Sequence, residues 1–210
     1  MDIWAKLQEI SLMAPPILLA VTVHELAHGF VADKLGDPTP RLAGRLTLNP
    51  LKHLDFWGTL VFVITGMIGW AKPVPVNSSY FKNPKKDMFW VALAGPASNI
   101  ILAFILSLAY RFMGRMPLPH GIWLNILTPV YLMLKVGVIL NLGLACFNLI
   151  PIPPLDGSHL VERFIPERYL WTYKRLETYG MLLLLLLVFT GTVDYLVIPP
   201  LHLLIKAFLG

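Results

Sequence analysis

Residues 10–31 read ISLMAPPILLAVTVHELAHGFV, and this stretch decides what kind of protein the chain can be. It is an apolar run long enough to cross a bilayer, because about 20 helical residues span the hydrocarbon core. Its ionisable residues gather near its end, in His24, Glu25 and His28. Ionisable groups within a membrane helix are expensive to hold there and usually mark a functional site. The stretch therefore predicts a membrane-spanning helix that carries chemistry.

The rest of the chain has the same apolar character. Its 210 residues are 56% hydrophobic and 14% charged, whereas soluble domains carry about 25% charged residues. The apolar runs predict spans at about 10–33, 88–112, 125–149 and 176–193, and give no clear assignment for the tail over 195–210. We expect an all-α polytopic membrane protein with about four to six transmembrane helices. A single membrane-embedded domain would cover residues 1–210, with a motif-bearing core over about 10–160 and C-terminal helices over about 165–210.

The segment from His53 to Trp70 determines how the chain crosses the membrane. It is short for a span and has four basic residues on each flank: Lys34, Arg41, Arg45 and Lys52 before it, and Lys72, Lys82, Lys85 and Lys86 after it. Basic residues concentrate on the cytoplasmic side, so both flanks can obey this rule only if the segment dips into the membrane and returns. The β-branched run over 61–65 favours a strand-like form. We expect a re-entrant, β-hairpin-like segment over 53–70, with a full crossing as the alternative.

The remaining loops support the same topology. Four further basic residues lie within 163–175, namely Arg163, Arg168, Lys174 and Arg175. We therefore expect a multi-pass protein of the cell membrane, with its N-terminus outside and its active site opening toward the cytoplasm. The lipid bilayer is its expected surrounding. The net charge of +5 is then explained by cytoplasmic loops, and we expect no nucleic-acid partner.

The polar group of the first run has the spacing of a metal site. His24 and His28 are four residues apart, so on a helix both imidazoles lie on one face and can bind one ion. Glu25 reaches the same side, where it can take a proton from water at the metal. This is the His-Glu-x-x-His pattern of zinc-dependent hydrolases. Packing of three ionisable residues between helices, without a metal, is the alternative interpretation.

A third protein ligand is needed to complete a catalytic zinc site. Asp156 is the candidate, because it follows a proline-rich stretch that must end the helix over 125–149. If 53–70 re-enters, the next two spans bring Asp156 back to the side where His24 and His28 lie. If 53–70 crosses, Asp156 emerges on the opposite side. An ordinary turn aspartate is the alternative interpretation.

These motifs resemble the site-2 protease family of intramembrane zinc metalloproteases, in the short prokaryotic type without a PDZ or CBS domain. The resemblance rests on five stretches: His24–His28, Gly44–Pro50, Gly69–Asn77, Gly95–Asn99 and Asn148–Gly157. It covers about residues 20–160, and no motif of the family is matched after about residue 165.

The resemblance implies a site and an activity. It implies one zinc ion bound by His24, His28 and Asp156, with Glu25 as general base, and contacts from Asn148 and Asn99 to substrate or transition state. The substrate would be a single-pass transmembrane protein or peptide, cleaved within or near its membrane segment. A membrane metal-ion transporter is the alternative function, although no inverted repeat is found in the sequence.

Overall fold

The computed structural model describes residues 3–65, 70–117 and 121–210 of the chain, and these form helices joined by short connections. The elements are α1 (Ile3–Lys34), α2 (Thr39–Leu42), η1 (Pro50–Lys52), α3 (Phe56–Thr65), η2 (Ser78–Tyr80), α4 (Pro84–Gly114), α5 (Ile122–Asn148), α6 (Asp156–Glu162), α7 (Glu167–Phe189) and α8 (Thr192–Leu209). No strand occurs among the described residues. The all-α class is therefore confirmed.

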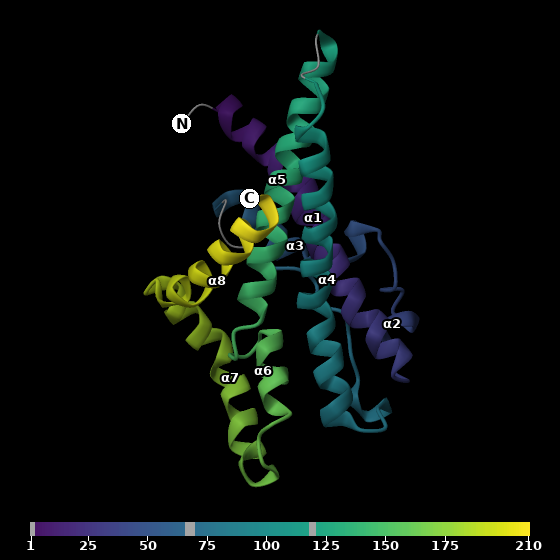
Figure 1. Ribbon diagram of the computed structural model, residues 1–210. Helices are drawn as coiled ribbons and strands as arrows, with labels where there is room; N and C mark the ends of the chain where they lie inside the picture. The colour runs from purple at the N-terminus through teal and green to yellow at the C-terminus, as the bar shows by residue number, and fades with distance from the viewer. Residues whose placement is uncertain (1–2, 66–69, 118–120) are drawn as a thin grey trace.

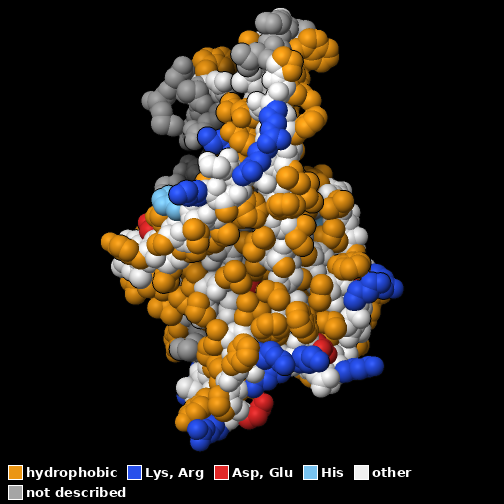
Figure 2. All heavy atoms as spheres, in the orientation of Figure 1, with side chains coloured by type: hydrophobic (Ala, Val, Ile, Leu, Met, Phe, Trp, Pro, Cys, Tyr) orange, Lys and Arg blue, Asp and Glu red, His pale blue; other side chains and the backbone are white. Residues whose placement is uncertain are grey.

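Four helices in the described part of the chain are long and apolar enough to cross a membrane. They contain the stretches Ile10–Lys34, Pro84–Gly114, Trp123–Asn148 and Thr192–Leu209. Figure 1 shows α4 and α5 as a long antiparallel pair, with α1 crossing them at an angle and α8 lying against them. Figure 2 shows apolar side chains over the middle of this face, with Lys and Arg side chains above and below this apolar band. Both features are those of a multi-pass membrane protein.

The structure corrects the position of the last span. The predicted span over 176–193 is wrong, because α7 has an apolar part, Glu177–Phe189, that is too short to cross, and the long apolar helix is α8. Gly191 separates the two helices with φ of 71°, a left-handed conformation that ends a helix. The apolar residues on both sides of this glycine had suggested one continuous span. The tail over 195–210 is thus part of the fourth long helix.

The structure also corrects the form of the segment over 53–70. Phe56–Thr65 is the helix α3, so the predicted β-hairpin-like form is wrong for these residues, and residues 66–69 lie outside the described part. Asp55 explains the helix, since its Oδ1 accepts a hydrogen bond from Gly58 N at 2.9 Å, as an N-cap does. This cap outweighs the β preference of the branched residues that follow.

The two ends of this segment nevertheless meet. Leu54 and Ala71 form an isolated antiparallel bridge, and Lys72 N donates to His53 O at 2.9 Å. The chain therefore returns to the place where the segment began. Because α3 has 10 residues, it is too short to span a bilayer by itself. Both observations agree with a re-entrant segment.

Candidate metal centre

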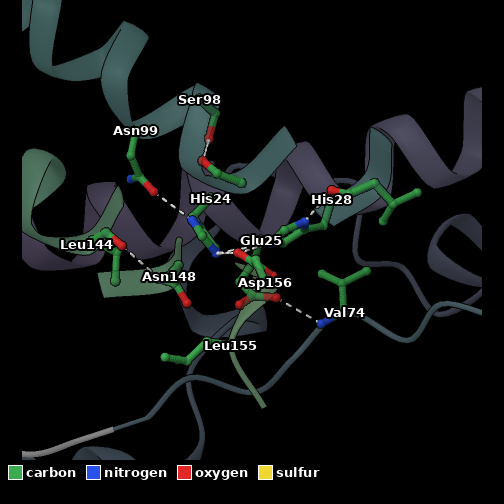
Figure 3. Close-up of polar contacts among 12 residues, drawn as sticks. His24, Glu25, His28, Val74, Ser98, Asn99, Leu144, Asn148, Leu155 and Asp156 are labelled. Carbon is green, nitrogen blue, oxygen red and sulfur yellow. Dashed lines mark hydrogen bonds and ion pairs between the residues drawn. The ribbon is translucent and has the colours of Figure 1, made fainter. Parts of the chain in front are cut away.

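Two histidines of α1 and one aspartate of α6 meet between the long helices (Figure 3). His24 Nε2 and His28 Nε2 lie 3.0 Å apart. Asp156 Oδ2 lies 3.2 Å from His24 Nε2 and 3.3 Å from His28 Nε2. The structure thus brings Asp156 together with His24 and His28, which precede it by 132 and 128 positions in the sequence. All three donor atoms lie within 4.8 Å of one another.

The break between α5 and α6 delivers the aspartate. α5 ends at Asn148 and α6 begins at Asp156, because the prolines between them cannot continue a helix. Gly157 lets the chain fold tightly at this point, since a Cβ there would lie 2.5 Å from the backbone carbonyl carbon of Leu149. The proline-rich stretch and the following glycine therefore place the carboxylate under the histidines.

A stripe of α4 supports the histidines from behind. Val91, Gly95 and Asn99 recur every four residues, so they lie on one face of α4, and this face runs antiparallel to α1. Gly95 has no room for a side chain, because a Cβ would lie 2.5 Å from His28 Cε1 and 2.6 Å from His24 Cε1. The two helices can approach this closely only with glycine at this position.

The outer nitrogen of each histidine has a partner on this stripe. His28 Nδ1 lies 2.7 Å from Val91 O, and a backbone carbonyl can only accept, so Nδ1 carries the proton. His24 Nδ1 lies 2.6 Å from Asn99 Oδ1 and donates to it in the same way. The Nε2 atoms of both rings are then free to offer a lone pair, which is how metal-binding histidines are oriented.

The orientation of Asn99 is itself fixed. Its Nδ2 donates to Ala20 O at 3.1 Å and to Asn141 Oδ1 at 2.8 Å, and Asn141 Nδ2 donates to Gly137 O at 2.8 Å. Both asparagine side chains are fully buried. Because the two backbone carbonyls can only accept, neither amide can turn over without losing hydrogen bonds. The network therefore holds the carbonyl of Asn99 toward His24.

The residues present fit a zinc ion. Asp156 Oδ2 is buried and makes no well-formed hydrogen bond with any described residue. It converges with two imidazole lone pairs, and electron-rich atoms placed so closely need a cation between them. The set of two nitrogens and one carboxylate oxygen is a zinc ligand set that leaves one position open.

Glu25 and Asn148 border the same space. Glu25 Oε2 accepts a hydrogen bond from Val74 N at 2.9 Å, so the extended chain after α3 holds the carboxylate beside the ligands (Figure 3). Asn148 Nδ2 donates to Leu144 O at 3.0 Å at the end of α5, and Figure 3 places its side chain next to the centre. Its contact with substrate stays a prediction.

The predicted contact of Asn99 with substrate also stays a prediction. In the structure its side chain lies behind His24 and is fully buried. The sequence analysis missed Asn141, although a signal was present. Asn141 precedes Asn148 by seven residues, which is two helical turns, and it is a lone amide in an apolar run.

This geometry is that of a metal-dependent hydrolase with two ligands on a candidate membrane span, and comparison with known proteins identifies the family. The model of peptidase family M50, the site-2 protease family, matches residues 13–135 and 125–190. The chain therefore belongs to this family.

Curated relatives agree with the assignment. The chain is 40% identical to the candidate zinc metalloprotease YwhC of Bacillus subtilis over 190 residues, which cover 89% of this chain and 84% of YwhC. It is 31% identical to the candidate zinc metalloprotease MJ0611 of Methanocaldococcus jannaschii over 162 residues, 76% of this chain and 72% of the relative. For the candidate zinc metalloprotease Rip2 of Mycobacterium tuberculosis, the identity is 30% over 150 residues, 69% of this chain and 54% of Rip2. No solved structure matches at comparable significance.

Family membership decides between the two functions that the sequence left open. The chain is a zinc metalloprotease of a membrane protease family, and four of its helices can span a membrane. The metal-ion transporter is therefore set aside.

Proposed function

We propose that this protein hydrolyses peptide bonds within or near the transmembrane segments of single-pass membrane proteins or peptides, in regulated intramembrane proteolysis. One observation carries the proposal: His24, Glu25 and His28 lie within Ile10–Lys34, a candidate membrane span. A hydrolytic centre on such a helix is suited to a substrate that also lies in the membrane.

One zinc ion would be held by His24, His28 and Asp156. When bound, zinc polarises the scissile carbonyl and makes water more acidic. The protein keeps three donor atoms converged for it, and the close packing of Gly95 against both imidazoles holds the two rings in place. Protonation of either Nε2 would compete with the metal, so the hydrogen bonds that hold each proton on Nδ1 favour metal binding.

Glu25 would serve as the general base. Its Oε2 is held by Val74 N, and no hydrogen bond from the described part of the chain engages Oε1. The oxygen of water forms a bond to the carbonyl carbon, and Glu25 accepts the proton that this water loses. Glu25 then gives the proton to the amide nitrogen as the carbon–nitrogen bond breaks, and returns to a carboxylate.

The substrate must open its helix before it reacts, because helical carbonyls are hydrogen-bonded within the helix. Asn148, beside Asp156 at the end of α5, would contact the opened segment.

The site would face the cytoplasm, with the N-terminus outside, since basic residues gather in the loops near His28 and Asp156. In a Cys146→Ser background, the Trp4→Cys variant should react with a membrane-impermeant maleimide added to whole cells. If the variant reacts only after the cells are permeabilised, this orientation is wrong.

The decisive experiment compares the wild type with Glu25→Gln. The zinc-loaded proteins are reconstituted in liposomes with a panel of labelled single-span peptides, and products are identified by mass spectrometry. We expect the wild type to cut at least one peptide within or near its span. Glu25→Gln should keep zinc and cut about 100- to 10,000-fold more slowly, the range that a general base supplies.

Glu177→Gln is the matched control, because Glu177 is exposed on α7. We expect this variant to cut at the wild-type rate. Equal rates for Glu25→Gln and wild type at equal zinc content would contradict the role of Glu25. A wild-type enzyme that cuts unfolded soluble peptides and none of the membrane-spanning ones would contradict the substrate class.

A further inference from the structure

Arg45 is a buried cation without a carboxylate partner among the described residues. The residue is 5% exposed, and none of the ion pairs between described residues includes it. Nearby Arg41, by contrast, is exposed and pairs with Asp33 at 2.6 Å. A buried charge is costly unless polar groups compensate it, so the contacts of Arg45 need an explanation.

The guanidinium group of Arg45 binds the extended chain that passes the metal centre. Its Nη2 donates to Lys72 O at short range and to Pro73 O at 3.1 Å. Its Nε is buried without a partner among the described residues. The positive charge is therefore directed at two consecutive backbone carbonyls, of which the second belongs to the Pro73–Val74 peptide.

The same peptide group holds the general base. Val74 N donates to Glu25 Oε2 at 2.9 Å. The Pro73–Val74 peptide is trans, since the cis bond of the described chain is Pro153–Pro154, and a trans peptide points its oxygen and its N–H in opposite directions. The guanidinium of Arg45 and the carboxylate of Glu25 thus lie at opposite ends of one peptide group.

We propose that Arg45 is a positioning residue for Glu25, acting through the Pro73–Val74 peptide. A cation at the carbonyl polarises the peptide, which makes its N–H a stronger donor, and this N–H fixes the carboxylate beside the metal ligands. The missing carboxylate partner of Arg45 is then Glu25, joined to it through one peptide. The inference rests on the proposed role of Glu25 and adds the group that holds it in place.

The segment that contains the Pro73–Val74 peptide is anchored on both sides of this peptide. Lys72 N donates to His53 O at 2.9 Å, and Asn77 N donates to Asp37 Oδ2 at 2.7 Å. Asp37 and Val74 are buried. These anchors keep the segment beside α1 when Arg45 is changed, so the effect of Arg45 on Glu25 can be measured separately from loss of the fold.

The test compares Arg45→Lys and Arg45→Met with wild type, using the peptide of the panel that wild type cuts best. We expect Arg45→Met to lower kcat of the zinc-loaded enzyme by about 10- to 100-fold, a part of what a general base supplies, with KM and zinc affinity within about twofold. Arg45→Lys keeps a cationic donor and should recover most of the lost rate. Arg41→Met is the matched control and should equal wild type.

A second measurement does not depend on turnover. A double-mutant cycle compares the melting temperatures of wild type, Arg45→Met, Glu25→Gln and the double variant. If the peptide couples Arg45 to Glu25, the shifts in melting temperature of the two single variants should not add up to the shift of the double variant. Additive changes, or an Arg45→Met enzyme as fast as Arg45→Lys, would overturn the proposal. If wild type cuts no peptide, the proposed function fails while the cycle still decides whether Arg45 and Glu25 are coupled.

Discussion

The helices around the metal centre and the two C-terminal helices differ in how they pack. In the most apolar stretch of α4, 39% of the residues are buried inside the protein. In the corresponding stretch of α8, 6% are buried. α4 meets α1 through Gly95 and the fully buried amide of Asn99. The C-terminal helices join the rest of the molecule mainly through apolar side chains such as Leu184 and Val193. One close backbone approach is added at Gly180, where a Cβ would lie 2.4 Å from Pro153 O.

This difference separates two kinds of sensitivity. Around the metal, single atoms decide the position of the ligands, because close-packed interiors transmit small displacements. Away from Gly180, the contact of α7 and α8 is a sum of apolar interactions that tolerate change when volume is kept. Substitutions near α4 should therefore alter metal affinity, and substitutions in the C-terminal helices away from Gly180 should alter stability alone.

The largest effect should come from Gly95→Ala. The new Cβ would lie within 2.6 Å of carbon atoms of both imidazoles, so one helix or both rings must move. We expect zinc affinity to fall by more than about 100-fold, beyond the 10- to 100-fold cost of losing an outer hydrogen bond. Competition with a chromogenic chelator in detergent measures this.

Gly143→Ala provides the control for that substitution. A Cβ at Gly143 would have its nearest neighbour, Leu201 Cδ2, at 3.9 Å, which is an ordinary contact. Zinc affinity should then match the wild type. If Gly95→Ala also binds zinc as tightly as wild type, the close approach of α1 and α4 is unimportant for the site.

A smaller effect is expected from Asn141→Leu. Leucine keeps the branching and the number of side-chain heavy atoms but leaves one N–H of Asn99 without its acceptor, which weakens the orientation of the carbonyl that faces His24. Because Asn141 acts one residue further from the metal, we expect an affinity loss of about tenfold, the lower end for outer-shell changes. Asn125→Leu, an exposed change on the same helix, should leave affinity unchanged; equal losses in both variants would exclude the amide network as the cause.

Much of the site could be predicted from the sequence because its residue types are rare in apolar runs. The spacing of His24, Glu25 and His28 predicts a metal site. The proline-rich break before Asp156 makes this residue the candidate third ligand. Asn141 and the backbone of Val91 could not be assigned, since their role depends on which faces of α1, α4 and α5 meet. Arg45 looked like one of many basic loop residues until its burial was known.

The C-terminal region was predicted less well for a physical reason. Apolar residues on both sides of Gly191 suggested a single span, and the tail over 195–210 received no clear assignment. The left-handed glycine and the packing of α8 against α5, through residues such as Leu201 and Ile205, decide the helix boundaries. A pattern of apolar residues contains neither piece of information.

Gly191→Ala should have the smallest effect and should spare the metal centre. At φ of 71°, alanine is strained by about 1–2 kcal/mol. In a protein of this size, 1 kcal/mol lowers the melting temperature by about 2–4 °C. Gly191→Asn should lie closer to wild type, because asparagine adopts this conformation more readily.

A loss of zinc affinity in Gly191→Ala, measured with the same chelator, would mean that the α7–α8 turn is coupled to the metal ligands. Leu184 and Val193 share an apolar cluster with Leu155, the residue before Asp156, so that coupling would run through this cluster and the two regions would not be independent.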